Sequence, residues 1–228
     1  MNFRAIVTTA LLGATLTTSA NAQISWDLGT SAGNAAVSSN SVSYLTASSV
    51  SQNNNHGVTT MLSAASPSSG YLGASGQYNA ASSGVAGQLN LSTSTYYQFT
   101  LTPSIGYEVS LSSISFGTRS TSSGPTNVAV YTSDDDFTYA IALGNSTSTW
   151  ALISSGPHTN ISGTAASPLV VRIYGYGGSG STSTANWRID DLTASGVSVV
   201  PEASTYAAIF GGVALVGAVL LRRRKAAA

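Results

Sequence analysis

The chain contains few charged residues and no cysteine. Lysine, arginine, aspartate and glutamate make up 7% of its 228 residues, whereas about a quarter of the residues in an ordinary soluble domain are charged. A surface of uncharged polar residues suits an extracellular environment and offers no basic face for a nucleic-acid backbone. Because cysteine is absent, no disulfide can stabilise the fold, which must rely on its core. The composition therefore argues against nucleic-acid binding.

Sequence motifs of enzymes are also missing. The two histidines, His56 and His158, lie in loop-like contexts, and HExxH does not occur. GxSxG is matched once, by residues 29–33, in a stretch typical of loops, so no zinc site or hydrolase triad is indicated. Residues 175–180 fit the pattern GxGxxG, but a dinucleotide site needs a helix directly after the glycines, and the sequence that follows is typical of a strand. We expect no cofactor and no enzymatic activity, and a hydrolase with an unrecognised site is the least favoured alternative.

The N-terminus has the three parts of a secretory signal peptide. Arg4 is followed by an apolar run from Ala5 to Leu16 and then by the small residues around Ala20 and Ala22. This order predicts cleavage after Ala22, with Ala20 and Ala22 as the small residues of the cleavage site. Residues 1–22 are therefore expected to direct export of the domain that follows.

The C-terminus combines an apolar run with a basic end. Residues 207–221 carry no charged side chain, and Arg222, Arg223, Arg224 and Lys225 follow them. A helix of that apolar run alone would be about 22 Å long, shorter than the roughly 30 Å hydrocarbon core unless flanking residues extend it. The positive-inside rule makes the four bases a cytoplasmic membrane stop and places residues 23–200, with three bases against seven acids and a net charge of −4, across the membrane.

A short box precedes the apolar run. Val200, Pro201 and Glu202, a polar step, the apolar run and the basic end follow one another in residues 200–228, and in this order they resemble the PEP-CTERM sorting signal of Gram-negative bacteria. The resemblance implies transient passage through the inner membrane and removal of the tail by an exosortase, a membrane-embedded cysteine peptidase. It also implies delivery to the cell surface. Ala203 replaces the second proline of the family's Pro-Glu-Pro box, and a permanent, unprocessed anchor is the alternative.

The conformation of the box follows from its proline. Pro201 fixes its own φ and keeps Val200 extended, so we expect an exposed, strand-like peptide before the helix. Glu202 would be the only charge at that face of the membrane.

The body, residues 23–199, is typical of short strands separated by Ser, Gly and Asn-rich turns, without helical periodicity. Clear strands are expected at residues 24–28, 96–102, 107–116, 127–132, 137–143, 150–153, 169–176 and 187–195, and weaker ones at 42–45, 58–62 and 88–91. About ten strands without helices predict an all-β fold, a single β-sandwich of jelly-roll type, with a right-handed β-helix as the alternative. The second half also resembles the globular part of many proteins with this sorting signal, which implies the same sandwich.

Alternation within two strands makes finer predictions. Val109 and Leu111 lie on one face and Ile114 and Phe116 on the other, so a period-2 strand can bury all four only with a bulge or break near residues 112–113.

In the segment WRIDDL, residues 187–192, alternation puts Arg188 and Asp190 on the same face, where we expect an exposed ion pair. Trp26, Trp150 and Trp187 are expected in the core.

Two groups of side chains are candidate ligand sites. Asp134, Asp135 and Asp136 could offer oxygen ligands to Ca²⁺, although an exposed turn is the favoured interpretation and no metal site is otherwise predicted.

Aromatic residues near Gly-rich turns are possible sugar ligands, above all Tyr174 and Tyr176, together with Tyr71 and Tyr78. The alternative is that they belong to the core or its rim.

The favoured function is that of an exported cell-surface or matrix protein of unknown molecular activity. Its expected partners are an exosortase, the inner membrane in passing and, because exosortase systems often accompany polysaccharide production, an exopolysaccharide. A carbohydrate-binding module is the second hypothesis. The sequence gives no indication of the oligomeric state.

Overall fold

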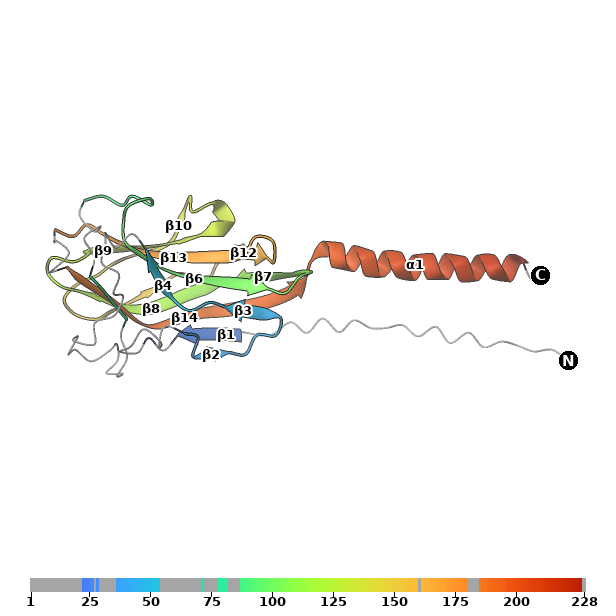
Figure 1. Cartoon of the computed structure of the whole chain (residues 1–228), viewed down its shortest axis with the longest axis horizontal. Coiled ribbons are helices and arrows are strands. Elements are labelled where there is room, and N and C mark those ends of the chain that lie inside the picture. Colours follow the sequence, from blue (N-terminus) through green and yellow to red (C-terminus); the bar gives the residue numbers. More distant parts are fainter. Residues whose placement is uncertain are drawn as a thin grey trace.

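The computed structural model describes residues 22–26, 28, 36–53, 71, 78–81, 87–159, 161–179 and 185–226. Within these ranges the chain forms fourteen β-strands, one 3-10 helix and one C-terminal α-helix (Figure 1). The strands form an eight-stranded and a six-stranded sheet, and their described pairings are antiparallel. The predicted all-β fold is confirmed.

The eight-stranded sheet is built around its longest strand, β14 (Asn186–Pro201). Its order is β11 (Ala151–Ser154), β8 (Ser113–Ser120), β14, β1 (Ala22–Trp26) and β2 (Ser39–Asn40). β5 (Tyr78–Ala81) pairs with the start of β14, β7 (Tyr107–Leu111) pairs with its end, and β12 (Ile161–Thr164) pairs with β7.

The six-stranded sheet has the order β10 (Ala140–Asn145), β9 (Asn127–Thr132), β13 (Leu169–Tyr176), β6 (Tyr96–Pro103) and β3 (Leu45–Ala47). β4 (Ser51–Asn53) pairs with the first residues of β6. The short η3 helix (Ser133–Asp135) follows β9.

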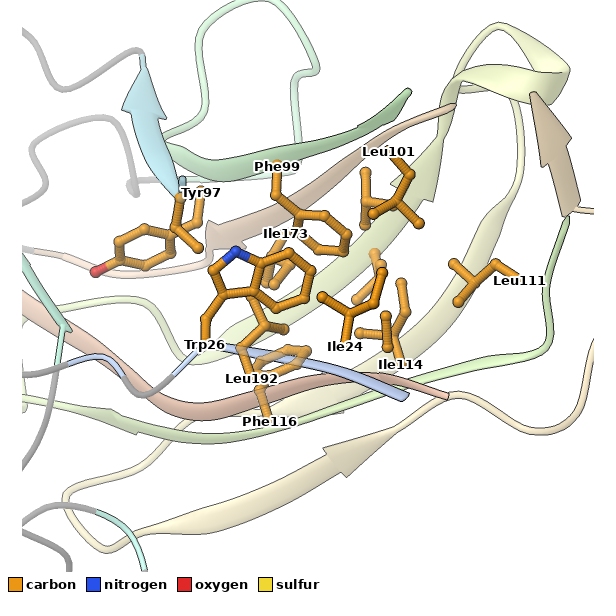
Figure 2. Close-up of a cluster of buried hydrophobic side chains, with 14 of the residues drawn as sticks. Ile24, Trp26, Tyr97, Phe99, Leu101, Leu111, Ile114, Phe116, Ile173 and Leu192 are labelled. Carbon is orange, nitrogen blue, oxygen red and sulfur yellow. The ribbon is translucent and has the colours of Figure 1, made fainter. Parts of the chain in front are cut away.

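Side chains from both sheets share one core, which Figure 2 shows in close-up. Trp26 of β1 packs on Phe99 of β6 with ring centroids 4.4 Å apart, and Tyr97 packs on Trp187 of β14 at 4.7 Å. The buried polar atoms of these rings have partners, since the Tyr97 hydroxyl donates to the Trp187 carbonyl at 2.9 Å and the Trp187 Nε1 donates to Thr118 Oγ1 at 3.0 Å. Two of the three tryptophans lie in the core as predicted.

The predicted interruption near residues 112–113 is confirmed. β7 ends at Leu111 and β8 begins at Ser113, and the apolar residues on both sides of the break are buried. Gly196 of β14, at φ 63°, lies against the break, where an added Cβ would be 2.6 Å from the Ser112 Cβ. The contact and the left-handed backbone both favour glycine at this position.

The predicted exposed pair of Arg188 and Asp190 is wrong. The register of β14 on β8 shifts between Asp190 and Thr193, and Asp191 has a φ of 48°. The bulge turns Leu192 into the core together with Ile189. Asp190 does lie on the outer face with Arg188, but it is 0% exposed, and its Oδ2 accepts the Tyr71 N–H at 2.7 Å. Strict alternation failed at Leu192 because Asp191 does not follow the pleat, whereas Asp190 is buried because Tyr71, far away in the sequence, lies against it.

Three further expectations need correction. The strand predicted at residues 137–143 begins at Ala140, because Asp136 and Phe137 are left-handed, at φ 56° and 57°, and belong to the turn after η3. Residues 88–91 form a turn in which the Asn90 side chain accepts the Ser92 N–H at 2.9 Å. Of residues 42–45 only Leu45 is in a strand. The strand expected at 58–62 lies outside the described residues.

Candidate functional site

The C-terminal helix α1 (Ala203–Ala226) leaves the domain directly after β14, with only Glu202 between them (Figure 1). Its segment Ala203–Arg223, 21 residues, is long and apolar enough to cross a membrane, and none of the tested window is buried. At 1.5 Å per residue it is about 31 Å long. Because the helix starts at Ala203 and not at residue 207, it reaches the length that the apolar run alone lacks.

The box before the helix is strand-like, as predicted, but it is not a free peptide. Pro201 is the last residue of β14 and pairs with Tyr107 of β7, and Val200 pairs with Glu108. Pro201 is half-buried, while Val200 is exposed. The expectation of an exposed peptide is therefore corrected: the β7 ladder covers one edge of the box.

The junction between box and helix is fixed by hydrogen bonds. The Glu202 N–H donates to the Gly106 carbonyl at 2.8 Å, and Thr205 Oγ1 donates to the same oxygen at 3.1 Å. The Glu202 carbonyl accepts the Thr205 N–H at 2.9 Å, which closes the first helical turn. The β6–β7 turn thus holds the root of the helix.

The remaining predicted sorting residues lie at the ends of the described chain. Ala203 is the first residue of α1, and Arg222 and Arg223 are exposed near its end, while nothing is described for the side chains of Arg224 and Lys225. Ala22 is the first residue of β1, where it pairs with Val197. Ala20 and the rest of the predicted signal peptide lie outside the described residues.

Tyr174, predicted as an exposed ligand residue, is completely buried on the outer side of β13. Its hydroxyl donates to the Leu91 carbonyl at 3.2 Å, and its ring contacts those of Tyr96 and Tyr131 at centroid distances of 5.0 and 5.8 Å. A ring enclosed in this way offers no free face to a sugar. Tyr176 is half-buried, and its role as a ligand residue stays a prediction.

Tyr96, Tyr131 and Tyr174 form an aromatic cluster on the outer side of the six-stranded sheet. Arg172 belongs to this cluster, and its guanidinium has both ring contacts and a hydrogen bond. Its guanidinium lies over the rings of Phe137 at 4.1 Å and Tyr96 at 4.8 Å, and its Nε donates to Gln98 Oε1 at 2.9 Å. The left-handed backbone of Phe137 accompanies this contact. The cluster is a closed structural unit on the six-stranded sheet.

The buried phenols predict a dependence of stability on alkaline pH. Burial raises the pKa of Tyr131 and Tyr174 above 10.0, opposed at Tyr174 by the Arg172 guanidinium. The folded state holds these protons more tightly than the unfolded chain, so this contribution is complete below pH 10 and is lost as the pH rises through the folded-state pKa. We expect the melting temperature to fall above pH 10. The absorbance at 295 nm, which follows the ionisation of tyrosine, should show that these two phenols ionise at a higher pH than free tyrosine. A Tyr174→Phe variant should lose part of this fall, and an identical pH profile would contradict the assignment.

The three adjacent aspartates form a turn. Asp134 and Asp135 lie in η3, and the Asp135 carboxylate accepts the N–H groups of Thr138 at 3.1 Å and Tyr139 at 2.9 Å. No group of three or more His, Cys, Asp or Glu residues that could hold a metal occurs in the part of the chain that the structure describes. The turn that the sequence favoured is present, and the absence of a calcium site stays a prediction.

The structure also places His158 and the strand that follows the glycine-rich segment. His158 Nε2 is 3.1 Å from the Ile141 carbonyl, which ties the imidazole to β10, while His56 lies outside the described residues. After the glycines at 175–180 the chain enters β14 at Asn186, so a strand stands where a dinucleotide site needs its helix.

Sequence reasoning missed one group on the outer side of the eight-stranded sheet. Arg119 of β8 and Arg188 of β14 are directly opposite each other in the antiparallel register. The two residues are far apart in the sequence, and only the pairing of these strands brings them together. No local pattern in the sequence could have indicated the pair.

No protein-family model, curated protein or solved structure matches the chain.

Proposed function

We propose that the protein is an exported cell-surface or extracellular-matrix protein, with a jelly-roll-like β-sandwich sorted by its C-terminal segment. The observation that carries this proposal is α1, an apolar helix that follows the box directly and has no buried residue in its apolar window. Such a helix needs an apolar environment that the domain does not provide. The bilayer is the environment that its length fits.

The direction of the helix supports the same function. Its basic end belongs in the cytoplasm by the positive-inside rule, so Glu202 and the β-rich domain lie on the opposite side. An N-terminal signal peptide ending at Ala22 is consistent with this topology. The low charge of the body, 7% over the whole chain, suits an extracellular surface.

The position of the box suggests how processing proceeds. The last four residues of β14, Ser198–Pro201, pair with β7, and Ser110 Oγ lies 2.7 Å from Ser198 Oγ. A peptidase that binds an extended peptide can reach the box only when the pairing between β14 and β7 opens. An exosortase therefore acts on a frayed end of β14, while the helix holds the box at the membrane surface.

Association with an exopolysaccharide completes the proposal, and a carbohydrate-binding module is the alternative. The outer faces of both sheets carry aromatic side chains among polar ones, for example Tyr176 on the six-stranded sheet and Tyr71 on the eight-stranded sheet. Aromatic rings with nearby polar groups are suited to sugar binding.

The sorting function is tested by expressing the chain with and without an exosortase and measuring the mass of the mature protein. We expect loss of the Arg-rich end only in the host that contains the enzyme. A chain with Pro201→Ala and Glu202→Ala, in which the helix is untouched, should keep its tail in both hosts. An intact tail on surface-delivered protein would mean that α1 is a permanent anchor.

A further inference from the structure

The body is poor in bases, yet two of them are neighbours. Residues 23–200 contain only Arg119, Arg172 and Arg188, and Arg119 and Arg188 face each other across β8 and β14. Both point away from the core, because the adjacent residues Thr118 and Trp187 are buried against it. Such a pairing is unfavourable for the sheet by itself, since like charges directly opposite repel.

The two guanidiniums are also incompletely hydrogen-bonded. The Nε atoms of Arg119 and Arg188 are buried and have no hydrogen-bond partner. Burial, and in second place the charge of Arg119, lowers the pKa of Arg188. Arg172, the third base, contrasts with them because two rings and Gln98 engage it. A buried donor without a partner is costly, and no residue that the structure describes accepts a hydrogen bond from either Nε atom.

Asp190, a carboxylate on this face, accepts hydrogen bonds from backbone groups. Asp190 lies opposite Gly117, one step along the sheet from the arginine pair. Its Oδ2 accepts the Tyr71 N–H at 2.7 Å and its Oδ1 accepts the Asp191 N–H at 2.9 Å. Asp190 therefore holds Tyr71 in place beside the arginines.

Aromatic rings border the pair. The Tyr71 ring lies over Gly117, where an added Cβ would be 2.5 Å from its Cγ, and it contacts Trp150 edge-on with centroids 6.2 Å apart. Trp150 directly precedes β11, whose first residue Ala151 pairs with Thr118. Continuing this register places Trp150 beside Arg119, so the predicted place of Trp150 in the core is wrong and the indole belongs to this outer face.

A guanidinium binds an oxyanion through a planar fork of N–H groups, and two of them can hold a carboxylate or sulfate from both sides. The adjoining rings can pack on the C–H groups of a sugar. Non-specific attraction of anions is not expected, because the body has a net charge of −4. The site is thus local and suits a negatively charged group attached to a ring.

We propose that Arg119 and Arg188, bordered by Tyr71 and Trp150, bind the oxyanion of an acidic sugar unit, a uronate carboxylate or a sulfate ester, within a polysaccharide. This proposal rests on the proposed association with an exopolysaccharide and specifies its chemistry. The eight-stranded sheet is then the binding face, whereas the aromatic cluster of the six-stranded sheet is structural.

The test is calorimetric titration of the full chain in detergent with three probes: oligogalacturonate, its methyl-esterified neutral form and a sulfated dextran oligosaccharide. We expect saturable binding of at least one charged probe and at least tenfold weaker binding of the neutral form. Binding of only the first or only the last identifies the carboxylate or the sulfate as the ligand group. Equal binding of charged and neutral forms, or no binding of any probe, overturns the proposal.

Variants locate the site. Arg119→Gln and Arg188→Gln should each weaken binding at least tenfold without lowering the melting temperature, because each removes a repulsive pair. Arg172→Gln removes the same charge on the other sheet and should leave affinity within twofold. Binding that persists in the double variant overturns the site. The same variants should be exported and processed like the unchanged chain, so failure of binding can be told apart from failure of the sorting proposal.

Discussion

Replacing Trp187 by alanine is expected to lower the free energy of unfolding by about 3–5 kcal/mol. The indole is 0% exposed and packs on Tyr97 from the opposite sheet. Gly175 leaves the space for it, since a Cβ there would lie 2.8 Å from Cε3 of the ring. Loss of the ring leaves a cavity between the sheets and removes the donor to Thr118 Oγ1. Urea unfolding of the full chain in mild detergent, followed by circular dichroism, measures the change.

Leu143→Ala is the matched control on the same domain. Leu143 is 71% exposed on β10, so its truncation should change the free energy of unfolding by less than about 0.5 kcal/mol. If both substitutions cost the same, the two sheets do not share the core that Figure 2 shows.

A chain that ends at Glu202 is expected to move almost completely from the membrane fraction to the soluble fraction. The truncation removes the whole of α1, whose apolar window makes no buried contact with the domain. The core residues all precede Glu202, so the melting temperature of the domain should change little. Membrane fractionation after carbonate extraction, in a host without exosortase, gives the distribution.

The control for this truncation keeps the helix and raises its apolar character. Gly211, Gly212 and Gly217 have nothing within 4 Å of an added Cβ, so replacing all three by leucine disturbs no packing and should leave the protein in the membrane. A truncated chain that still sediments with membranes would mean that the domain itself binds the bilayer.

Most of the fold could be predicted from local alternation. The strand near residues 96–102 alternates between buried and partly buried positions over most of its length. The structure places this strand and those near 127–132 and 169–176 at nearly the predicted bounds. The break at Ser112 was predictable because a shift in parity cannot be accommodated by a regular strand. These signals lie within single strands, where sequence reasoning is strongest.

The errors arose where contacts between distant segments decide the outcome. Tyr174 is buried because the turn at Leu91 covers it, and that turn is not near it in the sequence. The bulge at Asp191 depends on an αL residue in the middle of a strand, which its sequence does not announce. The arginine pair exists only through the register of β8 on β14. A motif search cannot detect a candidate site whose residues are brought together only by the register of two strands.

β14 also has a mechanical consequence. Arg188 lies near its first residue and the root of α1 follows its last. Under the two proposals above, a polysaccharide bound at one end and a bilayer that holds α1 at the other would pull on this one strand. The strand between Arg188 and Pro201 is about 40 Å long at 3.3 Å per residue. Such a force passes along the covalent backbone of β14, which is already extended, while the pairings with β8, β1 and β7 hold the strand in place. In the proposed function, β14 would therefore transmit the force between polysaccharide and membrane without unfolding the rest of the sheet.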